Sequence, residues 1–166
     1  MPLTVTTANL TGGPATDVKL GPSGSEVSLG GTRNPVGYEE TKDFVDSLVS
    51  QKKGVLKKRS YRRRFFVFFT LAEVTLDNLQ LALDLPSSCL SASTLTVDEQ
   101  DAQELSCIIE APGPNSKTWT YTFGKVIALE ATTLPQYVED GESEISIRFE
   151  VLQDTTDDSW FTVIEG

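Results

Sequence analysis

The chain has 166 residues, enough for one domain with a sizeable core, and its 39% hydrophobic and 23% charged residues are typical of a globular protein. It carries 24 acidic and 14 basic residues, a formal charge of -10. No apolar run reaches the roughly 20 residues that span a bilayer, and the first residues lack signal-peptide features. We therefore expect a single domain, residues 1–166, in a reducing compartment and without a membrane partner.

Histidine is absent, which excludes Ser-His-Asp and Cys-His nucleophile systems and most zinc and haem ligation. The two cysteines, Cys89 and Cys107, have apolar neighbours and are expected to be buried structural thiols without a disulfide. Acidic runs at 98–101 and 154–158 lack the ligand spacing of an EF-hand and indicate solvated turns. We expect a non-enzymatic protein with no catalytic residues, metal or cofactor.

Residues 1–38 contain short alternating pieces separated by turn residues. Residues 17–20 and 26–29 alternate polar and apolar side chains around Gly-Pro-Ser-Gly at 21–24, which predicts a hairpin of short strands. The glycines do not indicate a phosphate-binding loop, because no G-x-x-x-x-G-K-[ST] pattern is present.

Residues 39–49 leave two structures open. Their apolar side chains at 44, 45, 48 and 49 have helical spacing, but the Phe, Val and Ser content also suits an extended arm. Residues 52–64 follow, with 8 of the 14 basic residues and no acid. All other residues carry 6 positive and 24 negative charges, a balance of -18, so the molecule is electrically two-faced.

Residues 65–73, FFVFFTLAE, are aromatic, β-branched and apolar on both faces, which predicts a central strand covered on each side. The period then changes, with Leu76, Leu79 and Leu83 at helical spacing. Thr75 is a plausible N-cap and Pro86 a stop. We expect one short amphipathic helix near 76–84, lying on a sheet.

Strand patterns return in the second half of the chain, over 104–111, 117–123, 125–131, 143–151 and 160–164. Trp119, Tyr121 and Phe123 line one face of their strand, and Gly124 is a candidate bulge. The predicted fold class is all-β, a β-sandwich or partial barrel of about seven or eight strands with one short flanking α-helix.

The basic segment has three interpretations: a contact with a neighbouring copy, a solvated loop, or a nucleic-acid-binding surface. We favour the first, because the acidic remainder of the chain would repel a polyanion and offers a docking surface for cations. Such a contact is heterologous and closes into rings or continues into filaments. The candidate contact residues are Lys52, Lys53, Lys57, Lys58, Arg59, Arg62, Arg63 and Arg64, with the acidic turn of Asp154, Asp157 and Asp158 as one possible receiving side.

Two stretches resemble a known family. Residues 65–83, FFVFFTLAEVTLDNLQLAL, lead from the predicted central strand through a LAEVTLxNL pattern into the predicted helix. Residues 121–126, YTFGKV, are followed by ISIRFEVLQD at 145–154, a Y-x-F-x-K-x … F-E-x-L-x-D ending. Both are similar to the tail tube (major tail) proteins of long-tailed bacteriophages.

The resemblance implies a structural virion protein of the phage tail, assembled in the host cytoplasm. Six copies would form a ring, and rings would stack into a tube through which DNA passes as transient cargo during ejection. The implied partners are the tape measure, tail terminator and distal tail proteins. By position, residues 39–64 match the family's loop or arm that reaches a neighbouring ring, and their basic run departs from the family's pattern.

Two other functions remain as alternatives. A tail terminator or head-tail joining protein would stop at a single ring, and a nucleic-acid-binding module would use the basic arm. An acidic subunit favours the tube, because a conduit for DNA needs a wall that repels its cargo.

Overall fold

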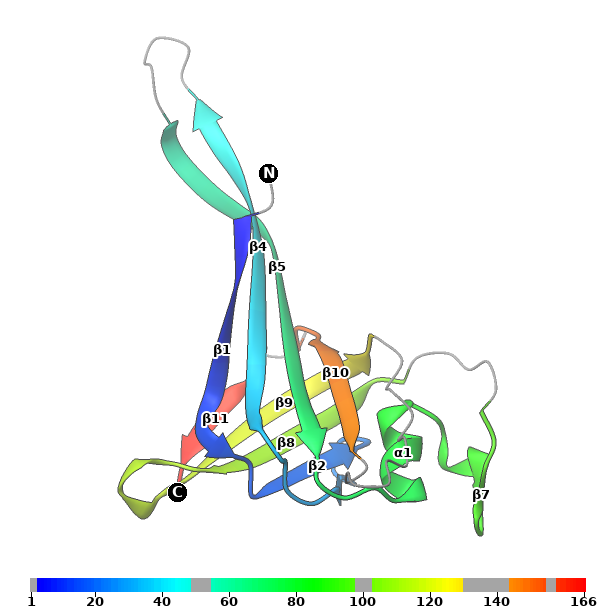
Figure 1. Cartoon of the computed structure of the whole chain (residues 1–166). Helices are drawn as coiled ribbons and strands as arrows, with labels where there is room; N and C mark the ends of the chain where they lie inside the picture. Colours follow the sequence, from blue (N-terminus) through cyan, green and yellow to red (C-terminus); the bar gives the residue numbers. More distant parts are fainter. Residues whose placement is uncertain (1–2, 49–54, 98–102, 130–143, 155–157) are drawn as a thin grey trace.

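A computed structural model describes residues 3–48, 55–97, 103–129, 144–154 and 158–166, and for residues 3–12, 45–48, 55–59 and 61 it describes the backbone alone. These residues form eleven β-strands, one α-helix and two short 3-10 helices. Nine strands make one large antiparallel sheet and two make a small hairpin (Figure 1). The predicted β-rich fold with one short helix is confirmed, but the described strands share one large sheet and form no closed barrel.

The large sheet has the strand order β1-β4-β5-β10-β9-β8-β2-β3, and β11 pairs with β9. Its strands are β1 Leu3–Pro14, β2 Asp17–Gly21, β3 Val27–Ser28, β4 Pro35–Leu48, β5 Val55–Leu71, β8 Leu105–Pro112, β9 Thr118–Ala128, β10 Ile145–Val151 and β11 Thr162–Glu165. The remaining elements are α1 Leu76–Ala82, the small hairpin β6 Leu90–Ser91 and β7 Thr94–Leu95, and the 3-10 helices η1 Ser87–Cys89 and η2 Pro114–Ser116.

The large sheet curls around a single core. In Figure 1, strands β4, β5 and β10 run steeply to β8 and β9, so the two halves of the sheet cross, as in orthogonal sheet packing. Val67, Phe69 and Phe149 from the first half and Ile109 and Phe123 from the second belong to the same buried cluster. Alternation along each strand places these residues on the inner face.

Helix α1 begins as the sequence predicts and ends earlier. The Thr75 hydroxyl accepts a hydrogen bond from the Asn78 backbone N–H at 3.1 Å, which confirms the predicted N-cap. The helix ends at Ala82, before the predicted end at 84, because Asp84 adopts a left-handed backbone with φ of 57°. Leu79 and Leu81 pack against the core, so the helix closes one side of the curled sheet.

Most of the strands expected from alternation are present. β2 and β3 pair through Lys19–Ser28 and Leu20–Val27, which confirms the first predicted hairpin. In the β8–β9 pairing, Leu105 lies opposite Val126 and Cys107 lies opposite Phe123, so the register shifts across Gly124 on β9. This shift confirms the bulge predicted at Gly124. The last strand begins at Thr162 instead of 160, and strand β1 had no counterpart among the predicted elements.

Residues 39–48 and 55–64 belong to a long antiparallel ribbon of β4 and β5, so the extended alternative for 39–49 is correct over its described residues. β1 pairs with β4 only as far as Lys42, and β10 pairs with β5 only as far as Phe65. Beyond these pairs the described part of the ribbon has two strands and projects from the body of the molecule (Figure 1). We call residues 43–64 the ribbon arm and all other residues the body.

Candidate inter-subunit contact site

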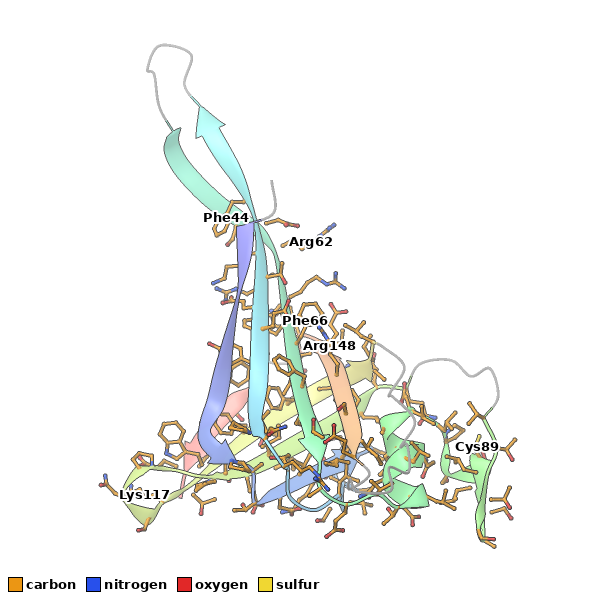
Figure 2. The ribbon with its side chains drawn as sticks, viewed as in Figure 1. Phe44, Arg62, Phe66, Cys89, Lys117 and Arg148 are labelled. Atoms are coloured by element: carbon orange, nitrogen blue, oxygen red, sulfur yellow. The ribbon has the colours of Figure 1, made fainter. Side chains whose placement is uncertain are left out.

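Phe66 lies at the root of the ribbon arm beneath two arginine side chains. The Arg64 and Arg148 guanidinium carbons are 5.5 and 5.1 Å from the centre of its ring. Phe66 is 7% exposed, and Figure 2 shows Arg148 beside it. The sequence predicts that this strand is covered on both faces; at Phe66 the covering groups include arginines, whose cations are attracted to the ring face.

Two ion pairs connect three strands around Phe66. The Arg64 guanidinium donates to both carboxylate oxygens of Glu150, at 2.6 and 2.9 Å, and Arg148 donates to Glu39 at 3.0 Å. Glu39, Phe66 and Glu150 stand in one row across β4, β5 and β10. The hydrogen bond and charge of Glu150 raise the pKa of Arg64, which stays charged. These contacts fix the root of the ribbon arm to the body.

The neighbouring basic residues have acidic partners on β4. Arg63 Nε lies 2.9 Å from Glu40 Oε1, which also binds Lys42 Nζ at 2.7 Å. Arg62 Nη1 is 4.0 Å from Asp43 Oδ2, and its side chain is 69% exposed. Of the three candidate contact arginines whose side chains are described, Arg62 is therefore the most available to a partner.

The other basic candidates are placed only in part. Lys57, Lys58 and Arg59 lie on β5 opposite Ser47, Asp46 and Val45. Lys52 and Lys53, and Asp157 of the predicted receiving turn, lie outside the described residues. The ribbon arm as a sequence holds eight basic and two acidic residues, a net charge of +6, and the body holds six basic and 22 acidic residues, a net charge of -16.

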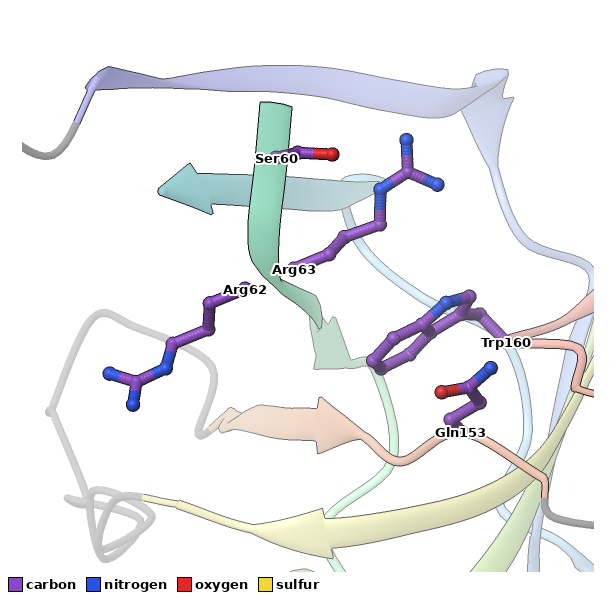
Figure 3. Close-up of a pocket in the computed structure, with 5 residues that line it drawn as sticks. All are labelled: Ser60, Arg62, Arg63, Gln153 and Trp160. Atoms are coloured by element: carbon purple, nitrogen blue, oxygen red, sulfur yellow. The ribbon is translucent and has the colours of Figure 1, made fainter. Parts of the chain in front are cut away.

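A hollow of about 550 Å³ lies beside the root of the ribbon arm, lined by Ser60, Arg62, Arg63, Gln153 and Trp160 (Figure 3). The Trp160 ring packs on Phe65 with centroids 5.0 Å apart. Asp154 and Asp158 belong to the same turn, where Gln153 Nε2 donates to the Asp158 carbonyl oxygen at 2.9 Å. The predicted receiving turn thus borders the root of the chain's own ribbon arm.

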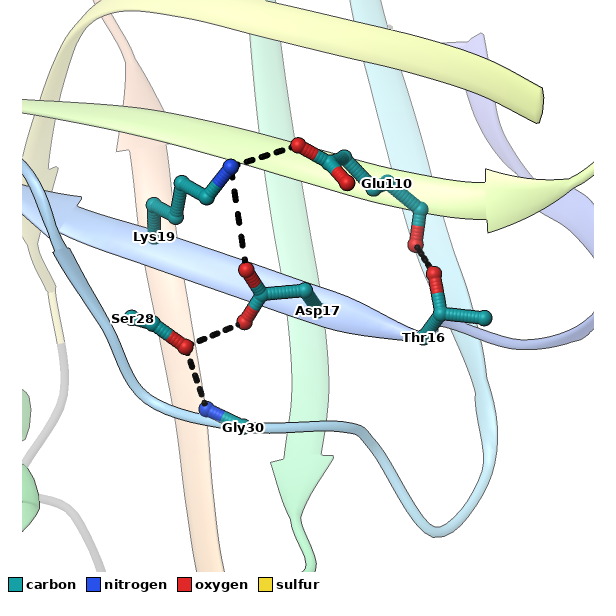
Figure 4. Close-up of polar contacts among 6 residues, drawn as sticks. All are labelled: Thr16, Asp17, Lys19, Ser28, Gly30 and Glu110. Atoms are coloured by element: carbon teal, nitrogen blue, oxygen red, sulfur yellow. Dashed lines mark hydrogen bonds and ion pairs between the residues drawn. The ribbon is translucent and has the colours of Figure 1, made fainter.

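A second polar cluster lies on the body, on β2 and β8 (Figure 4). Lys19 Nζ lies 2.5 Å from Glu110 Oε1 and 3.7 Å from Asp17 Oδ2. The Ser28 hydroxyl donates to the other oxygen of Asp17 at 2.5 Å. The charge of Lys19 is therefore neutralised within the chain, and the hydrogen bond to Glu110 raises the pKa of Lys19.

The described residues also bear on metal binding, membrane spanning and cysteine chemistry. They contain no group of three or more His, Cys, Asp or Glu residues that could hold a metal ion. Within the same residues, no helix is long and apolar enough to cross a membrane. Cys89 and Cys107 are free and buried, and burial raises the pKa of the Cys107 thiol to about 12, so it remains protonated at neutral pH.

Sequence reasoning missed the partners of the arginines at the root. Arg148, Glu39 and Glu150 were not among the candidate contact residues. A signal exists in β10, where Ile145, Ile147 and Phe149 alternate with polar residues that must lie on the outer face. The pairing with β4 and β5 residues depends on sheet order, which local alternation does not give.

A scan against protein-family models and a search of curated proteins gave no match. The resemblance to tail tube proteins therefore rests on the residue patterns within 65–83 and 121–154 alone.

Proposed function

We propose that this chain is a structural protein that assembles with copies of itself, as a phage tail tube subunit that forms hexameric rings and stacks them into a conduit for DNA ejection. The observation that carries the proposal is the ribbon arm, a two-stranded extension of charge +6 on a body of charge -16. Opposite charges on one chain favour contact between identical copies.

The ribbon arm also lacks the support that an isolated hairpin needs. A two-stranded ribbon is at best marginally stable in water, and among the described strands β4 and β5 have only each other beyond Lys42 and Phe65. Their outer edges carry unpaired backbone groups that favour association. Docking on a neighbouring copy would cover these edges, and because arm and receiving surface differ, the contact would form rings or stacks.

The negative charge of the body is suited to the wall of a conduit that does not bind the DNA passing through it. Phosphate groups repel a surface of charge -16, whereas binding to DNA requires clustered cations. In this proposal the arms, which hold most of the cations, are covered by neighbouring copies. The tape measure, tail terminator and distal tail proteins would be the other partners, and the virion tail would be the location.

Negative-stain electron microscopy of the concentrated protein tests the proposal. We expect rings with a central hole wider than the roughly 20 Å duplex, and stacks of such rings. Single rings that never stack would support a tail terminator or joining protein instead. A protein that remains monomeric and binds oligonucleotides tightly, with a steep salt dependence, would contradict the proposal in favour of a nucleic-acid-binding module.

A pair of matched variants tests the ribbon arm itself. Arg59→Gln with Arg62→Gln removes two cations from the arm, and Lys117→Gln with Lys125→Gln removes two from the body. Lys117 and Lys125 pair with Glu165 and Glu104 on the body surface, at 3.3 and 3.1 Å. We expect only the arm variant to shorten the stacks and reduce their sensitivity to salt. Equal effects of both variants would show that total charge, not the arm, controls assembly.

A further inference from the structure

We propose that the ribbon arm of one copy binds a second copy at the end of the body away from its own arm. The receiving surface consists of residues 26–31 and 72–77, and we call it the distal surface. The proposal rests on the function proposed above and identifies the partner surface for the arm.

The two segments of the distal surface are bonded into one unit. Asn78, which is 5% exposed, donates from Nδ2 to the carbonyl oxygens of Leu29 and Glu73, both at 3.1 Å. The Ala72 backbone N–H donates to the Gly31 carbonyl oxygen, also at 3.1 Å. Figure 1 places the end of β5 and helix α1, which flank residues 72–75, at the end of the body remote from the projecting ribbon. The surface is therefore fixed in place before a partner arrives.

The chemistry of the distal surface complements the ribbon arm. Three aliphatic side chains are exposed on it, Val27 by 57%, Val74 by 37% and Leu76 by 38%. Its segments also hold three carboxylates, Glu26, Glu73 and Asp77, and no lysine or arginine. The ribbon arm combines eight basic residues with apolar ones. Apolar contact surrounded by charges of opposite sign is the usual composition of a specific protein interface.

Glu73 is placed where an incoming cation would meet it. Its carboxylate lies over Gly30, so that a Cβ atom on Gly30 would be 3.1 Å from Glu73 Cδ. Gly30 has a φ of 84°, a conformation that glycine adopts readily and that allows the close approach. Asp77 lies in the first turn of α1, two residues after the N-cap Thr75. Residues 72–77 therefore carry one carboxylate that contacts the 26–31 segment, at Glu73, and one at the start of α1, at Asp77.

The distal surface and the acidic turn of Asp154 and Asp158 differ in where they lie relative to the ribbon arm. That turn borders the root of its own ribbon arm (Figure 3), so docking there would bring the arm ends of two copies together. In a contact between the arm of one copy and the distal surface of the next, each end of the stack still has a free arm or a free distal surface, so stacking continues. The six residues of β4 beyond Lys42 span about 20 Å, which is how far this described part of the strand extends past its pairing with β1.

Two charge-matched variants distinguish these surfaces. Glu73→Gln with Asp77→Asn removes two charges from the distal surface, and Glu144→Gln with Asp158→Asn removes two elsewhere, one of them from the acidic turn. We expect the distal variant to raise the protein concentration needed for assembly at least about threefold, the range of two exposed ion pairs, and the second variant to change it less. A larger effect from the second variant would overturn the proposal. Urea unfolding checks that both variants fold.

A charge exchange tests the contact directly. Lys57→Glu with Arg59→Glu reverses two arm residues that stand opposite Ser47 and Val45, so no acid lies directly across the ribbon from either change. We expect this variant not to assemble. Assembly should return when the variant is mixed with a second protein that carries Glu73→Lys and Asp77→Lys, or when all four substitutions are combined in one chain. If wild-type protein assembles but the exchange restores nothing and the distal variant behaves as wild type, the distal surface is overturned and the tube function stands. If wild-type protein forms no assemblies at all, both proposals fail.

Discussion

Asn78 is a single side chain that holds two segments of the chain together. Its buried amide donates to two carbonyl oxygens, those of Leu29 and Glu73. Asn78→Asp would remove the donor and leave both carbonyls facing a carboxylate, which we expect to cost about 1–3 kcal/mol of unfolding free energy. Urea denaturation measures this, with Asn115→Asp in an exposed turn as the control. A loss no larger than that of the control would contradict this role for Asn78.

Asp84 follows α1 with a side chain that is 8% exposed. Its Oδ2 accepts a hydrogen bond from the Gln103 backbone N–H at 2.8 Å, and Oδ1 has no hydrogen-bond partner among the described residues. Burial raises the pKa of this carboxyl above its ordinary 3.8, and the hydrogen bond from Gln103 offsets only part of that effect. The folded chain therefore binds a proton at Asp84 more readily than the unfolded chain does.

The elevated pKa of Asp84 predicts a pH dependence of stability. Because the folded state binds more protons, the contribution of Asp84 to stability falls as pH rises from 3.8 through its elevated pKa. Asp84→Asn does not ionise and suits the φ of 57°, so we expect its stability relative to wild type to improve as pH rises from about 3 to 7. Urea denaturation across this range measures the difference, and a constant difference would contradict the assignment.

At the scale of elements, the strands of the second half were predictable because their burial alternates locally. β10 shows the pattern clearly, with Ile145, Ile147 and Phe149 buried and the residues between them more exposed. The conformation of residues 39–49 was not decidable, because apolar residues at 44, 45, 48 and 49 fit a helix as well as a strand. Pairing with β5 decides it, and that pairing is a tertiary property.

The candidate site was predictable in its charge and not in its contacts. The basic run at 52–64 is evident from composition, and the ribbon does carry it. The bidentate pair of Arg64 and Glu150, however, joins residues 86 positions apart and exists because β5 and β10 are neighbours. Strand β1 was missed for a similar reason, since its Thr-rich and Gly-containing sequence is weakly apolar and it forms by pairing with β4.

The root contacts predict how firmly the ribbon arm is held. Glu150→Gln would replace the carboxylate that pairs with Arg64, whose side chain is 50% exposed, and we expect a loss of about 1 kcal/mol. Glu165→Gln, in the exposed pair with Lys117, serves as the control. Hydrogen exchange at the β5 amides near Phe66 should accelerate in Glu150→Gln and not in the control. Equal exchange in both would show that the pair does not hold the arm.

At the scale of the whole molecule, the charge distribution makes two opposite predictions about DNA. A free chain has a ribbon arm of charge +6, which favours phosphate, whereas in the proposed assembly neighbouring copies cover the arm and the body of charge -16 faces the DNA. Fluorescence anisotropy with a labelled duplex should therefore show weak, salt-sensitive binding to the free subunit and less binding to assemblies at the same protein concentration. The Arg59→Gln, Arg62→Gln variant should lose the weak binding, and the Lys117→Gln, Lys125→Gln variant should retain most of it. Assemblies that bind the duplex more tightly than free subunits would contradict a conduit that lets DNA pass, because the cations would then line the path of the DNA.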